Sequence, residues 1–358
     1  MRRMILILAA VVLVVAALGY ALRGAVALRL VEIVMDRNLG ENPLEDFDDG
    51  LHVILCGAGG PLPDPSRTRS GPCAAVVAGE KLYLVDAGGD SARHLGEMQL
   101  PPGLVEAVFL THFHSDHIDG LGELATLRWA GNANEAPLPV YGPPGVAGVV
   151  DGFNRAYRLD VGYRVAHHGE KTVPPSGAGL VAERFEPAPA GAPVTVFEAD
   201  GLRVTSFLVE HEPVAPAVGY RFEYAGRTAV FSGDTKKSAA VVRNAKRADL
   251  LVHEALSARL IGLFREVAER KQVENMRKIL LDIPDYHTTP VEAAEVAQEA
   301  GAGHLLYTHV VPPLPAPGLD VIFLEGVSDA YSGGVTLGVD GTMISLPANS
   351  DAIHVSSR

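Results

Sequence analysis

The order of apolar and polar residues divides the chain into a long apolar start and a body of short apolar runs. Residues 4–22 carry no charge, are rich in Ile, Leu, Val and Ala, and show no polar face at any helical period. Because about 20 apolar residues cross a bilayer as a helix, this run predicts a membrane-spanning helix. Residues 21–49 follow as a helical stalk that ends in an acidic linker at 41–49.

The body of the chain has short apolar runs bounded by Gly, Pro or polar residues, which is typical of buried strands. Residues 119–130, 254–281 and 291–300 predict helices, and Thr289 with Pro290 provides a favourable start for the last of these. Residues 143–193 predict a loop-rich region. The predicted strands are residues 51–55, 74–78, 81–85, 105–110, 194–197, 202–209, 220–224, 228–231, 305–307 and 335–339. Strands and helices alternate in two successive series, which predicts a layered sandwich with two sheets inside and helices outside.

The flanks of the apolar start suggest where it would lie in the cell. Arg2 and Arg3 precede it and would keep the N-terminus in the cytoplasm. The sequence therefore predicts a single-pass anchor in the bacterial inner membrane with the remaining chain in the periplasm. A signal peptide cleaved near the small residues 25–27 is the alternative, and it would release the protein into the periplasm.

Composition and charge narrow the classes of protein and partner. The chain has 358 residues, a formal net charge of −13 and two cysteines. Such an acidic chain has no general attraction for nucleic acid, so nucleic acid is not expected as a partner. Cys56 and Cys73 cannot build a disulfide scaffold or a cysteine-rich zinc module; they either pair or lie apart as small buried residues.

The strongest chemical signal is the segment THFHSDH at residues 111–117. His112 and His114 stand two residues apart at the end of a predicted strand, so their side chains project to the same side. Asp116 and His117 follow where the chain must turn toward a helix. Imidazole and carboxylate groups suit zinc, and they also suit iron or manganese.

Three later residues also stand at or just after the ends of predicted strands, and together they complete two metal sites. The first predicted site consists of His112, His114, His211 and Asp234. The second consists of Asp116, His117, His309 and Asp234, so that Asp234 bridges two ions. We therefore predict two zinc ions, with manganese or iron as alternatives.

These motifs resemble those of the metallo-β-lactamase superfamily, over residues 51 to about 347. The chain is most similar to the ribonuclease Z and arylsulfatase branch, on the segments CGAG at 56–59, LVDAG at 84–88, VGYRF at 218–222, HEA at 253–255 and HTT at 287–289. The resemblance implies an α+β, four-layer αβ/βα sandwich with the metals at the sheet edges. The predicted parts are then a membrane anchor or signal segment (1–27), a stalk (28–50), the catalytic domain (51–347) and a polar tail (348–358).

The resemblance also assigns residues to a reaction. Glu254 and His287 would correspond to a paired carboxylate and histidine near the scissile group, with His287 as acid and Glu254 fixing its tautomer. Asp116 would bind one metal and orient the water. Asp86, Thr111, Ser232 and Thr235 would support the ligands. We predict a dinuclear zinc hydrolase that uses a metal-bridging hydroxide to cleave an anionic ester, either an aryl sulfate or a phosphodiester.

Several alternatives remain open at this point. One is a ribonuclease Z-type tRNA 3′-processing endonuclease, against which stand the predicted export and the few basic residues of the segment 171–193. Others are a lactonase, a one-iron sulfur dioxygenase and a binding module without catalysis. The predicted partners are a small anionic ester as substrate, the membrane through the N-terminal helix, and a second copy in a homodimer.

Overall fold

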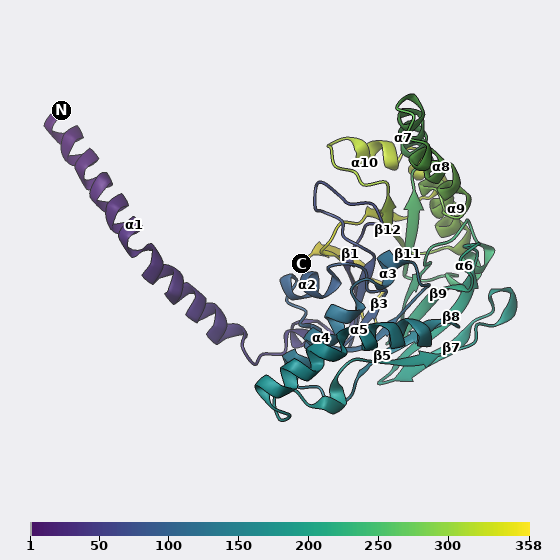
Figure 1. The fold of residues 1–358 in the computed structure, drawn as a ribbon. Coiled ribbons are helices and arrows are strands. Elements are labelled where there is room, and N and C mark those ends of the chain that lie inside the picture. Colours follow the sequence, from purple (N-terminus) through teal and green to yellow (C-terminus); the bar gives the residue numbers. More distant parts are fainter. Residues whose placement is uncertain (1) are drawn as a thin grey trace. The chain divides into compact units, whose positions relative to one another are not determined.

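The computed structural model describes residues 2–358 and divides the chain into two units, Met1–Pro43 and Leu44–Arg358. The first unit is one long helix, α1 (Arg2–Asn38). The second unit contains the strands and the other helices that the structure describes (Figure 1).

The predicted membrane anchor needs correction. In the part of the chain that the structure describes, no helix has both the length and the apolar character needed to cross a membrane. The apolar start belongs to a 37-residue helix that continues through the charged residues Arg23, Arg29, Glu32 and Asp36. This finding contradicts the predicted inner-membrane location and the periplasmic placement derived from it.

Two sheets form the centre of the second unit. The first has the strand order β15-β14-β1-β2-β3-β4-β5-β6, and the second has the order β13-β12-β11-β10-β9-β8-β7. The strands of the first sheet are β1 (Gly50–Gly57), β2 (Cys73–Ala78), β3 (Lys81–Val85), β4 (Val105–Phe109), β5 (Leu138–Gly142), β6 (Leu180–Arg184), β14 (Thr342–Pro347) and β15 (His354–Ser357). Those of the second are β7 (Val194–Ala199), β8 (Leu202–Val209), β9 (Ala217–Tyr224), β10 (Arg227–Phe231), β11 (Leu250–Leu256), β12 (His304–Val311) and β13 (Gly334–Leu337).

Both sheets are mixed, with a parallel half and an antiparallel half. Strands β3 to β6 pair in parallel in the first sheet, and β10 to β13 pair in parallel in the second. The carboxyl ends of neighbouring parallel strands meet at one edge of a sheet, which is where ligand sites form in α/β proteins. The loops after β4 and β10 and the last residues of β12 carry most of the predicted metal ligands.

The helices of the second unit connect the strands, and several of them cover the outer faces of the two sheets. They are α2 (Ser91–Glu97), α3 (Ser115–Ile118), α4 (Leu121–Asn132), α5 (Val146–His168), α6 (Ala239–Asn244), α7 (Ala258–Arg270), α8 (Glu274–Asp282), α9 (Pro290–Ala300), α10 (Leu319–Phe323) and α11 (Val327–Ala330). One apolar core joins the first sheet to α2, α4 and α5, and another joins the second sheet to α6 and α9. A third core lies between the sheets.

Strand β1 shows how the sequence produces these layers. Its alternate residues Leu51, Val53 and Leu55 enter the core between the sheets, while Ile54 and Cys56 face the helices. A strand buried on both faces is mainly apolar, as β1 is apart from the buried His52. The predicted four-layer sandwich is confirmed.

Two predicted segments differ from the structure. Glu254 lies in the buried strand β11 rather than in a helix, and the helices α7 and α8 begin only at Ala258 and Glu274. Residues 250–256 form a short, fully buried segment that is apolar except for His253 and Glu254, and periodicity does not distinguish strand from helix in such segments. The region expected to be loop-rich contains the 23-residue helix α5, whose exposed face is too polar and glycine-containing to give a clear helical pattern.

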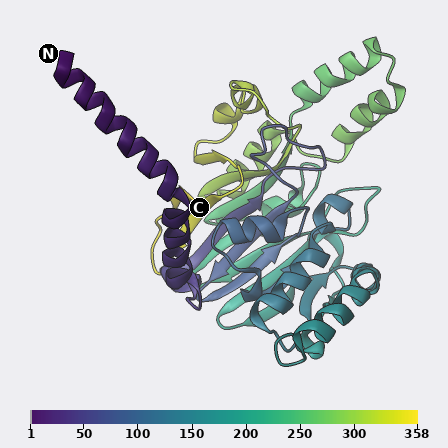
Figure 2. The ribbon, with the colours of Figure 1, turned by 60° about the vertical axis from the view of Figure 1, so that its left-hand side comes forward.

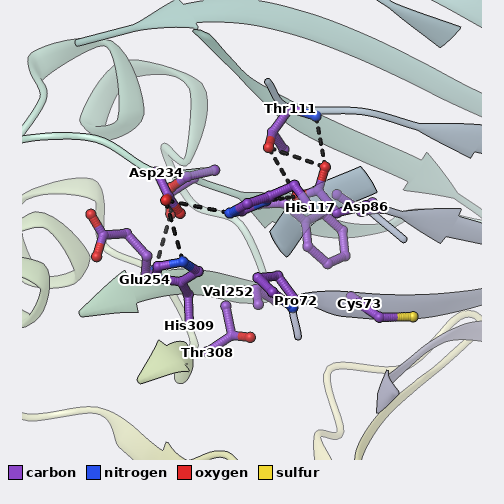
Figure 3. Close-up of a pocket in the computed structure, with 15 residues that line it drawn as sticks. Pro72, Cys73, Asp86, Thr111, His117, Asp234, Val252, Glu254, Thr308 and His309 are labelled. Carbon is purple, nitrogen blue, oxygen red and sulfur yellow. Dashed lines mark hydrogen bonds and ion pairs between the residues drawn. The ribbon is translucent and has the colours of Figure 1, made fainter. Parts of the chain in front are cut away.

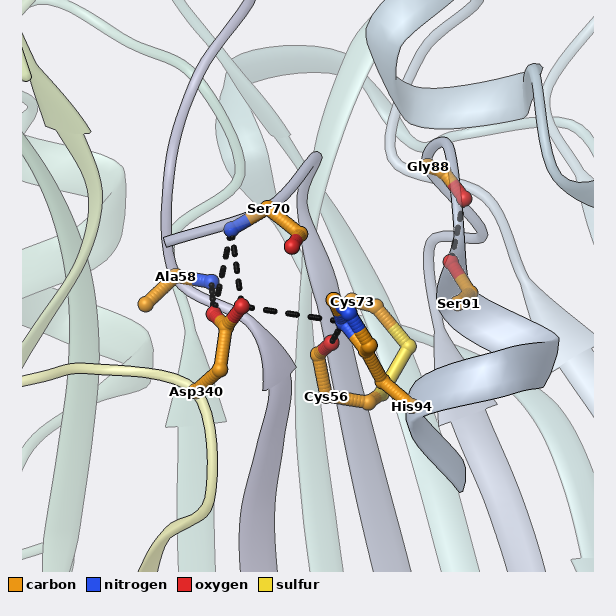
Figure 4. The surroundings of a disulfide bond; sticks show 8 residues. All are labelled: Cys56, Ala58, Ser70, Cys73, Gly88, Ser91, His94 and Asp340. Carbon is orange, nitrogen blue, oxygen red and sulfur yellow. Dashed lines mark hydrogen bonds and ion pairs between the residues drawn. A yellow bond between two sulfur atoms is a disulfide. The ribbon is translucent and has the colours of Figure 1, made fainter. Parts of the chain in front are cut away.

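The two cysteines form a disulfide between the end of β1 and the start of β2 (Figure 4). Their Cα atoms lie 5.0 Å apart. His94 faces the Cys56 carbonyl oxygen at 3.1 Å, and Asp340 accepts hydrogen bonds from the amides of Ala58 and Ser70. The disulfide and Asp340 therefore tether both ends of the loop that runs from Ala58 to Ser70 beside the candidate site.

Candidate metal centre

The segment HFHSDH forms a sharp turn between β4 and a single helical turn. His112 follows the end of β4 and is fully buried, and His114 is the residue before α3. Helix α3 then presents Asp116 and His117. This helix packs closely on the loop after β3: a Cβ at Gly88 would lie 2.3 Å from the Asp116 carbonyl oxygen, so the approach requires glycine.

His309 reaches the site because of an irregularity in β12. The pairing of β11 with β12 shifts between Glu254 and Ala255, which leaves His309 without a direct partner in the ladder. His309 has a φ of 45°, in the left-handed region that a side chain such as histidine adopts only infrequently. A β-bulge of this kind redirects one side chain, and such bulges are common beside active sites.

Asp234 lies at the centre of the cluster. Its Oδ2 atom is 3.3 Å from His309 Nε2 and 3.4 Å from His117 Nε2. The same oxygen is 3.8 Å from His112 Nε2 and 3.9 Å from His211 Nε2. Asp116 completes the arrangement, with its Oδ2 3.3 Å from His309 Nε2. The structure thus brings together all seven residues that the sequence predicted as metal ligands.

The seven side chains and His287 fall into three groups of close ligand atoms, two of which match the predicted sites. Potential ligand atoms lie within 4.8 Å of one another in each of three sets: His112, His114, His211 and Asp234; Asp116, His117 and His309; and Asp234, His287 and His309. The first set equals the first predicted site. The second set equals the second predicted site without Asp234, which approaches it through His117 and His309.

Asp86 holds the second group in position (Figure 3). Its carboxylate accepts hydrogen bonds from the amide and hydroxyl of Thr111, and it faces His117 Nδ1 at 2.8 Å. When Nδ1 donates to Asp86, Nε2 of His117 is left for a metal, which is the usual arrangement of ligand histidines. Asp86 itself has a φ of 59°, which Asp and Asn tolerate better than most residues.

Replacing Asp86 by Asn is expected to weaken zinc binding by about 10- to 100-fold, because an amide has one acceptor oxygen where the carboxylate has two. Competition titration against a zinc chelator measures the change. Asp90→Asn is the matched control, because Asp90 is exposed, has a similar φ of 66° and makes no capping hydrogen bond. Equal zinc affinities for the two variants would contradict the supporting role of Asp86.

The protonation pattern of the cluster fits cation binding. Burial lowers the pKa of His112 well below its ordinary value, with a further contribution from His117. Burial alone would raise the pKa of Asp234, but His309 and His117 outweigh it and hold that pKa well below the usual range. Burial alone would lower the pKa of His117, but Asp234 and Asp86 raise it well above the ordinary value. A metal would therefore displace a proton from His117.

Two orphaned nitrogens test whether a metal fits. Among the described residues, neither His117 Nε2 nor His211 Nε2 has a hydrogen-bond partner, although both are buried. Buried polar atoms are nearly always paired, and these two lie beside the Asp234 carboxylate. Their Nδ1 atoms are already engaged, by Asp86 and by the carbonyl oxygen of Tyr286. The donor set therefore fits metal ions with nitrogen and oxygen ligands.

Glu254 and His287 form a second unit beside this cluster. Oε1 of Glu254 lies 3.0 Å from His287 Nδ1 and accepts hydrogen bonds from the amides of Thr235 and Thr288. Burial alone would lower the pKa of His287, but the Glu254 carboxylate outweighs burial and raises it to about 9. His287 is thus held in one orientation and favoured in its protonated form.

Tyr286 contributes to the site but was missed by the sequence analysis. Its carbonyl oxygen lies 2.9 Å from His211 Nδ1, and its ring centroid lies 5.0 Å from that of His211 and 4.8 Å from that of His287. Because the carbonyl oxygen of any residue could make this contact, the identity of the residue gives no signal in the sequence. The one available indication was that Tyr286 directly precedes His287.

Comparison with known proteins defines the family. Residues 82–310 match the family model described as the beta-lactamase superfamily domain, so the chain belongs to the metallo-β-lactamase superfamily. Within it, ribonuclease Z of Mycobacterium bovis is 35% identical over 292 residues, which cover 81% of this chain and 96% of that relative.

Two solved structures have the same fold at lower identity. The metallo-β-lactamase fold protein YhfI of Bacillus subtilis has a TM-score of 0.59 at 21% identity, over 83% of this chain and 100% of its own. The short form of human tRNase Z has a TM-score of 0.58 at 23% identity, over 83% of this chain and 99% of its own. At these identities the likeness concerns the fold alone.

The relatives correct two functional expectations. A relative named ribonuclease Z acts on RNA, which overturns the prediction that nucleic acid is not a partner and that a small anionic ester is the substrate. The error arose because the net charge of a whole chain does not describe the charge at its site. The aryl-sulfate half of the predicted activity has no support in these relatives, whereas metal-dependent hydrolysis of a phosphodiester agrees with them.

Proposed function

We propose that this protein is a ribonuclease Z-type endonuclease, which cleaves RNA phosphodiesters at the 3′ side of precursor tRNA with two zinc ions. The observation that carries the proposal is the convergence of four histidine nitrogens on the Asp234 carboxylate, one of which, on His309, also contacts Asp116. The extent of similarity to ribonuclease Z, over 81% of the chain, supports RNA as the substrate.

In this proposal, His112, His114 and His211 would hold one ion, Asp116, His117 and His309 would hold the other, and Asp234 would contribute to both. Zinc is preferred because imidazole dominates the ligand set, with manganese and iron as competitors. When bound, two zinc ions supply positive charge for the phosphate and lower the pKa of an attacking water.

The remaining steps belong to residues of the chain. Glu254 accepts a hydrogen bond from His287 Nδ1, so Nε2 of the same ring faces the cleft. A protonated His287 would donate its Nε2 proton to the leaving oxygen, which neutralises the developing charge. Asp116 would orient the attacking water from its place at the N-terminal turn of α3.

The test is cleavage of a 5′-labelled precursor tRNA that carries a 3′ trailer. The purified protein with about two zinc equivalents is expected to give one endonucleolytic product, and a chelator is expected to stop the reaction until zinc is restored. Mature tRNA without a trailer serves as the control substrate. If the zinc-loaded protein leaves the precursor intact, the proposed function is wrong.

A further inference from the structure

The cleft beside the metal centre has an apolar wall. Helices α7 and α8 form a hairpin that stands away from the two sheets (Figure 2). Met276, Ile279 and Leu280 of α8 line a cavity of about 280 Å³. The same cavity is lined by the candidate metal-binding residues His114, Asp116, Asp234 and His309, and by His287.

Of the three wall residues, only Leu280 belongs to the buried core that packs the hairpin. Ile261, Ala268 and Leu280 are buried between the helices and β11 and hold the hairpin to the body. Met276 and Ile279 are 41% and 52% exposed, although both are large and apolar. Apolar surface left in water is unfavourable by about 25 cal/mol per Å², and such patches mark binding sites.

The charge of the cavity indicates which part of a substrate it takes. Of the described residues that line it, none is a lysine or arginine, and the acidic ones are the proposed ligands Asp116 and Asp234. A phosphate would therefore be held at the metal centre rather than at the wall. The wall is left for an uncharged group that is covalently attached to that phosphate.

Tyr286 gives this cavity an aromatic face. Its half-buried side chain lines the cavity between the wall and the rings of His211 and His287. The uncharged, planar part of a nucleotide is its base, and unpaired bases stack on aromatic and apolar side chains.

We propose that Met276, Ile279 and Tyr286 form a subsite for one unpaired nucleobase next to the scissile phosphodiester. This inference rests on the proposed RNA-cleaving function. A base within a duplex cannot enter a cavity of this kind without unpairing, so the subsite would restrict cleavage to RNA that is single-stranded at the cut.

The experiment pairs a protein variant with a substrate variant. Wild type and a Met276→Ala/Ile279→Ala double variant cleave the precursor RNA, with either a normal base or an abasic nucleotide at each position flanking the scissile bond. For one flanking position, loss of the base is expected to lower kcat/KM of the wild type about tenfold. On the normal substrate, kcat/KM of the double variant is expected to be lower than that of the wild type by about the same factor. Removing the base is expected to cause no further decrease for the double variant.

Leu263→Ala/Val267→Ala is the matched control, since these α7 side chains are 51% and 39% exposed and lie outside the cavity lining. It is expected to retain the wild-type preference for the normal base. Helical circular dichroism, Tm and zinc content verify the fold, and Ile279→Ala alone repeats the test if the double variant is unstable. If the loss in kcat/KM from removing the base and the loss from the double substitution multiply, the proposed subsite is wrong, but the proposed RNA cleavage is not affected. If wild type cleaves no RNA, the proposed function fails and the subsite with it.

Discussion

Replacing His114 by Ala is expected to reduce bound zinc from about two equivalents to about one and to lower RNA cleavage by at least about 10³-fold. His114 belongs to the group of ligand atoms that includes His112, His211 and Asp234. In His114→Ala, three of the four groups in this set remain, so an ion bound there would lose one of its four donors. It would also lose the ligand that lies directly before α3. The nucleophile and the charge that balances the transition state would then be lost together.

The measurement is zinc content by elemental analysis together with single-turnover cleavage on the same sample. His114 is half-buried and precedes α3 without capping it through its side chain, so the fold should persist. His168→Ala removes an exposed histidine in the last turn of α5 and should behave as wild type. Full activity of His114→Ala with two zinc equivalents would refute the ligand assignment.

The fold could be predicted where local pattern and burial agree. Strands β3 and β8 have the predicted bounds, because each is rich in apolar residues and follows a Gly-containing turn. Helix α9 begins at Pro290, as predicted from Thr289 and Pro290, and the structure adds a capping box between Thr289 and Glu292. These elements depend on neighbours in the sequence, and the sequence analysis could therefore locate them.

The remaining features depend on contacts between distant segments. The bulge at His309 arises from the register of β11 with β12, and nothing in the sequence near residue 309 signals it. The pairing of Cys56 with Cys73 needed the strand order of the first sheet. The hairpin α7–α8 was predicted as one helix together with part of β11, so the apolar wall of the cleft was not visible.

The sequence located the residues of the candidate site more completely than the elements of the fold around them. His112, His114, Asp116 and His117 share one short segment, and strand ends predicted where His211, Asp234 and His309 would meet them. The chemistry of the partner was not predicted correctly, because −13 is a sum over the chain and the cleft is defined by a few residues. The geometry of the site follows from the order of the strands, whereas the choice of substrate depends on the side chains that line the cleft.

Replacing His287 by Ala is expected to leave both zinc ions bound and to slow RNA cleavage by about 10²- to 10⁴-fold, the usual contribution of a general acid. The loss should be much smaller with bis(4-nitrophenyl) phosphate, because nitrophenolate leaves without a proton. The pKa of His287 is raised to about 9, so the acid form predominates at neutral pH and is lost as the pH rises through that value. Bound cations would lower this pKa, so the alkaline decline of the wild-type rate should lie at or below pH 9 and be absent in the variant.

Glu254→Gln separates the acid from the group that orients it. An amide at this position can still accept a hydrogen bond from His287 Nδ1, but it no longer favours the charged ring, so an intermediate loss with an alkaline decline at lower pH is expected. His287 also lies within ligand distance of Asp234 and His309, which offers a competing role as a metal ligand. Zinc content decides between the two roles: loss of one ion in His287→Ala would make His287 a ligand, while two ions with unchanged rates on both substrates would remove it from the reaction altogether.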